Sequence, residues 1–98
     1  MVTGWKDTQK GVEVRSSFGD ELTVIYNGLL KNSGADQVYM HYGFGDTNRW
    51  YDVDTKRMEH SNQGFEKSIK MRNHTLKFCF KDSANNWDNN SGHNWTVR

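Results

Sequence analysis

Apolar and polar side chains alternate with a period of two along most of this chain. The pattern is clearest in QVYMHYGF, GFEKSIKM and HTLKFCFK, at residues 37–44, 64–71 and 74–81. A period of two places successive side chains on opposite faces of a β-strand. No segment carries the 3.6-residue stripe of an amphipathic helix over about ten residues. The chain is therefore predicted to be all-β.

Clusters of Gly, Asn, Asp and Ser, including NGLLKNSGAD and DSANNWDNNSG, separate the alternating segments. Short strands with turn residues between them are typical of antiparallel sandwiches. We expect a single-domain, immunoglobulin-like antiparallel β-sandwich over residues 12–98, with residues 1–11 as an N-terminal lead-in, and 98 residues suit one domain. The seven expected strands are residues 12–18, 21–27, 37–44, 49–54, 64–71, 74–81 and 93–98.

The charge balance and the apolar content exclude several classes of function. Thirteen Lys and Arg against 12 Asp and Glu give a net charge of +1. Nucleic-acid-binding domains carry a clear cationic excess, so we expect no nucleic-acid partner. No apolar run approaches the roughly 18 residues of a membrane span, and MVTGWKDTQKG lacks the apolar core of a signal peptide. Cys79, the single cysteine, is expected to be a small packed residue.

The segment DSANNWDNNSGHN, residues 82–94, holds a single large apolar side chain, Trp87. Loops of this length without internal structure are uncommon in compact domains and are usually functional or disordered. Asparagine tolerates unusual backbone angles and bonds to nearby backbone groups. We therefore expect a fixed polar loop that holds a large aromatic ring near solvent. Its asparagines are Asn85, Asn86, Asn89, Asn90 and Asn94.

Motifs of catalysis are absent from the sequence. It contains no nucleophile elbow, no Cys–His pair at catalytic spacing and no zinc signature. The late loop fails the calcium-loop template at Ala84, Trp87 and His93, although an irregular calcium site stays open as an alternative. We expect neither an enzyme nor a bound cofactor.

A carbohydrate-binding site is the hypothesis that uses the remaining features. A sugar ring has an apolar face and a rim of hydroxyls, so it suits an exposed flat aromatic ring flanked by polar groups. Trp50 and Trp87 follow polar, turn-like stretches, and alternation places His41 on the outward face of its strand. Trp5 and Trp95 are expected to pack in the core or on the surface instead. The candidate binding residues are Tyr39, His41, Trp50, Trp87, Asn89 and Asn90.

The alternative from another class is an immunoglobulin-like structural or protein-interaction domain. Such a domain needs no exposed aromatic rings. Retardation of the protein in a native gel that contains amylopectin distinguishes the two hypotheses.

Several segments in order resemble a known family of binding modules. The run VYMHYGFGD, then Trp50, then GFEKSIKM and LKFCFKD, then NNWDNN is similar to carbohydrate-binding module family 25 and to the related families 26 and 53. The resemblance covers Val12 to Arg98. It implies a non-catalytic, monomeric β-sandwich that binds starch and related α-glucans, such as maltooligosaccharides and glycogen. It also implies an extracellular protein with an amylase-type catalytic domain in the same polypeptide.

The resemblance also implies a binding platform of one histidine and two tryptophans. These fall on His41, Trp50 and Trp87, with the two indoles inclined to match a curved α-1,4-glucan. The hydrogen-bonding amide after the second tryptophan falls on Asn89, with Asn90 beside it. Family 26 relies more on a tyrosine, which falls on Tyr39.

Overall fold

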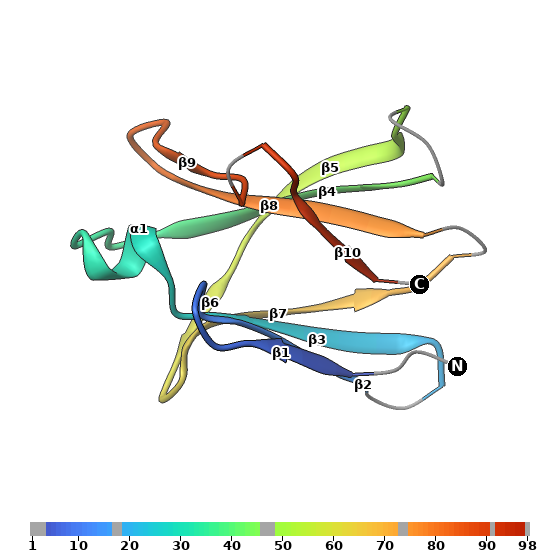
Figure 1. Ribbon diagram of the computed structural model, residues 1–98, viewed down its shortest axis with the longest axis horizontal. Coiled ribbons are helices and arrows are strands. Elements are labelled where there is room, and N and C mark those ends of the chain that lie inside the picture. The colour runs from blue at the N-terminus through green and yellow to red at the C-terminus, as the bar shows by residue number, and fades with distance from the viewer. Residues whose placement is uncertain (1–3, 17–18, 46–48, 73–74, 91, 98) are drawn as a thin grey trace.

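The computed structural model describes residues 4–16, 19–45, 49–72, 75–90 and 92–97. Within these residues the chain forms ten strands and one short helix (Figure 1). No described helix has the length or the apolar content needed to cross a membrane. The elements are β1 (Trp5–Asp7), β2 (Val12–Ser16), β3 (Glu21–Tyr26), α1 (Leu29–Asn32), β4 (Val38–Phe44), β5 (Tyr51–Arg57), β6 (Glu59–Ser61), β7 (Gly64–Lys70), β8 (Leu76–Asp82), β9 (Trp87–Asp88) and β10 (Trp95–Val97).

The strands make two sheets that pack face to face (Figure 1). The first sheet has the order β1-β2-β3-β7-β6, and the second has the order β10-β8-β4-β5. β9 and β10 both pair with β8, at its two ends, and every described pairing is antiparallel. The prediction of an all-β, antiparallel β-sandwich is confirmed.

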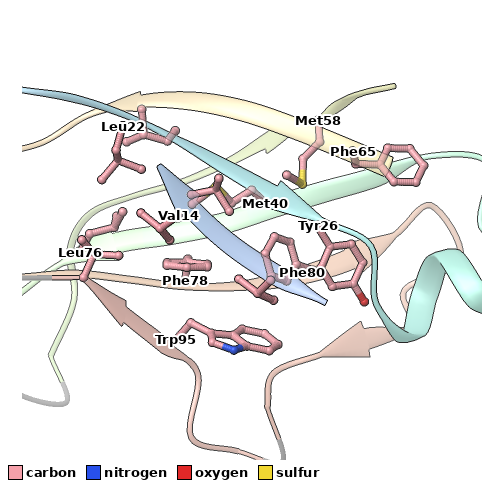
Figure 2. Close-up of a cluster of buried hydrophobic side chains, with 14 of the residues drawn as sticks. Val14, Leu22, Tyr26, Met40, Met58, Phe65, Leu76, Phe78, Phe80 and Trp95 are labelled. Carbon is pink, nitrogen blue, oxygen red and sulfur yellow. The ribbon is translucent and has the colours of Figure 1, made fainter. Parts of the chain in front are cut away.

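Alternation within the strands builds the core between the sheets. On β8, Leu76, Phe78 and Phe80 are fully buried, and they belong to one core cluster with inner residues of the first sheet such as Leu22 and Tyr26 (Figure 2). The side chains between them along the strand turn to the opposite side of the second sheet. We call that side, which faces away from the first sheet, the outer face.

Some elements differ from those expected. Helix α1 lies in a stretch read as a turn cluster, because one helical turn with one buried residue, Leu30, is too short to show a helical period. β6 and β9 have three and two residues, too few to show alternation. β1 lies within the expected lead-in and pairs with β2, while the division at residue 12 stays a prediction. The expected strand ends at residues 17–18, 74 and 98 lie outside the described residues.

Candidate carbohydrate-binding site

β4 runs through the middle of the second sheet and presents Tyr39, His41 and Gly43 to the outer face. In the register of the sheet, His41 lies between Cys79 on β8 and Thr55 on β5. His41 Nδ1 is hydrogen-bonded to Thr55 Oγ1 at 2.7 Å, whereas Nε2 makes no hydrogen bond with a described residue. The neighbouring strand therefore orients the imidazole and leaves one nitrogen available to a ligand.

Trp50 precedes β5 and lies half-buried against the backbone of β4. An added Cβ at Gly43 would lie 3.0 Å from both Cβ and Cε3 of Trp50. The missing side chain at Gly43 therefore makes room for the indole to rest on the sheet. The centroids of the Trp50 and His41 rings are 5.8 Å apart, and the ring planes are inclined by 30°.

Trp87 lies on β9 with 47% of its surface exposed. Its strand neighbour Asp88 turns inward, where Asp88 Oδ2 accepts a hydrogen bond of 2.6 Å from the Tyr26 hydroxyl. The same hydroxyl accepts the Leu30 N–H at 3.0 Å. Burial and the nearby Asp88 charge raise the pKa of Tyr26, so the hydroxyl keeps its proton. This buried hydrogen bond attaches β9 to the core through Asp88. Because neighbouring side chains of a strand point to opposite faces, Trp87 is directed outward.

The loop between β8 and β9 is fixed by the carboxylate of Asp82. Its Oδ1 accepts the backbone N–H groups of Ala84 (2.9 Å) and Asn86 (2.8 Å), and its Oδ2 accepts the Asn86 amide (2.9 Å). Hydrogen bonds from the Asn86 side chain and from these N–H groups lower the pKa of Asp82. The expected tolerance of asparagine for unusual backbone angles is also met, since φ is +63° at Asn85 and +57° at Asn94. These hydrogen bonds hold the loop in one conformation next to Trp87, which agrees with the fixed polar loop expected from its composition.

The two asparagines that follow Trp87 have different surroundings. Asn89 lines the hollow beside Trp87, and its Oδ1 accepts the Gly92 N–H at 3.0 Å, which leaves its amide N–H₂ for a ligand. Asn90 does not line the hollow, and its Nδ2 donates to the Asn94 carbonyl at 3.1 Å. Asn90 thus closes the loop between β9 and β10.

Together these residues form a shallow hollow of about 420 Å³ on the outer face. A larger hollow of about 480 Å³ lies on the first sheet, but its described lining residues include no aromatic ring on which a sugar could stack. Tyr39 lies on the outer face outside the lining, with its hydroxyl 3.0 Å from Gln37 Oε1. The lining of the hollow is His41, Trp50, Val53, Cys79, Trp87, Asn89 and Asn94.

Sequence reasoning missed the supporting residues of this hollow. Val53 and Asn94 line the hollow, and Thr55 supports it through the hydrogen bond to His41. Strand register and loop closure bring these residues there, and a single sequence displays neither. Gly43 could have been recognised from the sequence, because a glycine inside a strand often marks a close approach of another group to the backbone.

Cys79 is buried beneath the rings, as expected for a packed residue, and burial followed by the Asp88 charge raises its pKa to about 11. It is therefore a neutral thiol in the floor of the hollow.

The angles that the two indoles make with the His41 ring limit how the indoles are inclined to each other. Its ring stands at 90° to Trp87 with centroids 5.5 Å apart, and at 30° to Trp50. The two indole planes must therefore be inclined by at least 60°, the difference between these angles. Neither indole is sealed in the interior, so both offer surface to a ligand.

Inclined aromatic rings and amide groups on one open face of a β-sandwich are the features expected of a carbohydrate-binding module. The chain matches the starch/carbohydrate-binding module family 53 over residues 22–78, more than half of its length. The chain belongs to this family. The matched range contains His41 and Trp50, whereas Trp87 lies beyond it. The expectation of a non-catalytic starch-binding module is confirmed.

A relative also matches most of this chain. An alpha-amylase of Clostridium acetobutylicum is 35% identical over an alignment of 82 residues, which covers 81% of this chain and 10% of the amylase. The chain thus spans about a tenth of the length of that relative. No solved structure matches the chain significantly.

Proposed function

We propose that the hollow on the outer face binds a curved α-1,4-glucan, with Trp50 and Trp87 stacked on adjacent glucose units. The inclination of at least 60° between the indoles is the observation that carries this proposal. Successive units of an α-1,4-glucan turn relative to one another, so their apolar faces meet inclined rings. A flat β-1,4-glucan would need rings that are nearly coplanar.

Polar groups beside the rings supply the hydrogen bonds to the sugar hydroxyls. His41 Nε2 and the Asn89 amide are directed to the ligand, because other atoms of both side chains are held by the protein. Tyr39 extends the platform for longer glucans, and Asn90 contributes by holding the loop. This division follows the family 25 arrangement of one histidine and two tryptophans, and we propose that closer relationship for the site.

The size of the site predicts weak binding. If each indole removes roughly 50–80 Å² of apolar surface from water, burial contributes about 1–2 kcal/mol per ring. Each hydrogen bond adds about 0.5–1.5 kcal/mol net. Two rings and one hydrogen bond each from His41 and Asn89 sum to about 3–7 kcal/mol, which corresponds to a Kd between several millimolar and roughly ten micromolar.

A weak site suits a module that is tethered to a catalytic domain. We propose that the chain is a monomeric part of a larger secreted amylase-type enzyme, and the amylase relative supports this. Attachment to the same polypeptide raises the effective concentration of the enzyme at the glucan, so a single weak site is sufficient.

Replacing Trp87 by alanine tests the site directly. We expect Trp87→Ala to weaken maltoheptaose binding about tenfold or more, because the loss of one stacked ring removes about 1–2 kcal/mol. Titration calorimetry measures the affinity, and circular dichroism checks that the fold is intact. Leu29→Ala is the matched control, because Leu29 is 60% exposed and does not line the hollow. Unchanged affinity in a folded Trp87→Ala variant would reject the assigned site.

The choice of ligand separates this function from a protein-interaction domain. Maltoheptaose should bind and cellohexaose should not, since the two differ in chain curvature. A wild-type protein that binds neither sugar and migrates equally in gels with and without amylopectin would overturn the proposal.

A further inference from the structure

Among the described strand residues, the outer face of the second sheet carries cationic side chains and no carboxylate. In the described part of β4, β5, β8, β9 and β10, the outward positions include Arg57, Lys77 and Lys81 and hold no carboxylate. The acids of β5, Asp52 and Asp54, line a separate hollow between the sheets. The whole chain has a net charge of only +1. The excess of positive charge therefore belongs to the face that carries the aromatic hollow and not to the chain as a whole.

Lys81 is held in a fixed position between two aromatic rings. In the register of the sheet it lies between Trp87 on β9 and Tyr39 on β4. Its Nζ is 5.8 Å from the centroid of Trp87 and 5.0 Å from that of Tyr39, and it donates to the Asp82 carbonyl at 3.0 Å. A surface lysine normally loses side-chain freedom when it binds a ligand. Here the ammonium is already ordered, and two of its N–H groups remain for a ligand.

Arg57 on β5 lies opposite Tyr39 and extends the line of neighbouring side chains formed by Trp87, Lys81 and Tyr39, which we call the row. The register places Trp87, Lys81, Tyr39 and Arg57 side by side across β9, β8, β4 and β5. Asp36 and Glu59 share a hollow with Arg57, yet Arg57 forms no ion pair with any described residue. The second cation of the row therefore also keeps its donors for a ligand.

We propose that Lys81, assisted by Arg57, forms an anion subsite beside Trp87 that binds phosphate monoester groups on the α-glucan. This inference rests on the proposed function, because the glucan must lie on Trp50 and Trp87 for its substituents to reach the row. An unsubstituted glucan is neutral and gains nothing from the local positive charge beyond ordinary hydrogen bonds. A phosphate monoester carries about −1.5 to −2 charges at neutral pH and three acceptor oxygens. It would accept charge-assisted hydrogen bonds from both side chains.

The test uses one ligand in two forms. Maltoheptaose carrying a 6-phosphate monoester is titrated into the chain before and after treatment of the sugar with phosphatase. We expect the phosphorylated form to bind about three- to tenfold more tightly at low ionic strength, in the range of exposed ion pairs. High salt should remove most of this difference, because the subsite lies at the surface.

Substitutions test whether Lys81 and Arg57 cause the difference in affinity between the phosphorylated and dephosphorylated sugars. Lys81→Gln should abolish most of the preference for the phosphorylated sugar, and Arg57→Gln should reduce it. Lys70→Gln is the matched control, since Lys70 lies on β7, in the hollow between the sheets. It should leave the preference unchanged.

Each contrary outcome has a distinct meaning. Equal affinity of the wild type for both sugar forms would overturn the anion subsite and leave the proposed function intact. If Lys81→Gln weakens both forms by the same factor, Lys81 is a hydroxyl donor only and the subsite is again rejected. Failure of the dephosphorylated sugar to bind would instead overturn the proposed function itself.

Discussion

Trp50 and Gly43 meet at a distance that leaves no room for another carbon atom. The Cβ of any other residue at position 43 would lie 3.0 Å from two atoms of Trp50 and 3.1 Å from Cγ2 of Val53. Both neighbours belong to the hollow, so a methyl group there must move the indole by a few tenths of an ångström or more. The inclination of Trp50 is therefore set by the absence of a side chain on the adjacent strand.

Gly43→Ala should thus weaken binding without removing any ligand-contacting group. We expect about a three- to tenfold loss of maltoheptaose affinity, since the displaced indole no longer matches the glucose face. Titration calorimetry in the wild-type and Trp50→Ala backgrounds forms a double-mutant cycle. The substitution should have little effect once Trp50 is absent. An equal loss in both backgrounds would show that Gly43 acts through something other than the indole.

For single residues, the sequence predicts the side chains that line the hollow better than it predicts the residues that hold them in place. His41, Trp50, Trp87 and Asn89 come together in one hollow, because polar context and strand alternation both direct such side chains outward. Their roles in binding remain predictions. Thr55 has no distinguishing context, since its contact with His41 arises from the register of β4 and β5.

The β8–β9 loop depends on one carboxylate. Asp82 accepts hydrogen bonds from two backbone N–H groups and from the Asn86 amide, which lower its pKa below the ordinary value. A folded-state pKa below the unfolded value means that ionised Asp82 stabilises the fold. This stabilisation is fully present above the unfolded-state pKa of about 4 and is lost as the pH falls through the lower folded-state pKa.

Asp82→Asn should therefore lower the Tm at neutral pH by a few degrees, and the difference should shrink as the solution is acidified below a pH of about 4. Thermal unfolding followed by circular dichroism over a pH series measures this effect. Asp20→Asn replaces an exposed carboxylate outside the loop and serves as the control. A Tm difference for Asp82→Asn that persists at low pH would contradict the assignment to charge.

The longer strands and β10 could be predicted from the sequence, whereas α1, β1, β6 and β9 could not. β4, β7 and β8 each have seven residues, enough for alternation to define both their existence and their inner faces. β9 has two residues and exists because the late loop returns to pair with β8 and the Tyr26 hydroxyl holds Asp88. Such tertiary causes leave no periodic trace in the sequence.

Trp95 connects the two sheets at the end of the chain. It is buried on β10, with ring centroids 6.1 Å from Phe78 and 5.3 Å from Phe80, and its Nε1 donates to Asp7 Oδ2 on β1 at 3.3 Å. It therefore contributes to the core of the whole sandwich. Its ring is not among those that line the hollow.

Trp95→Ala should consequently affect stability and spare binding. Loss of a large buried aromatic side chain reduces the free energy of unfolding by about 3–5 kcal/mol. Urea denaturation measures this change, and maltoheptaose titration at a temperature where the variant is folded measures affinity. If a folded Trp95→Ala variant loses affinity as strongly as Trp87→Ala, then the separation of core and binding tryptophans is incorrect.

The rings of the hollow rise from a broad sheet surface and are not enclosed at the bottom of a deep pocket, since Trp87 leaves nearly half of its surface in water. A polymer can therefore lie across them at any point along its length, with both ends continuing past the protein. Recognition then requires no free terminus, so the same site could grip strands packed into an insoluble granule as readily as short fragments in solution. If the chain is part of an amylase-type enzyme, as we propose, the catalytic domain would be held beside internal linkages of the glucan.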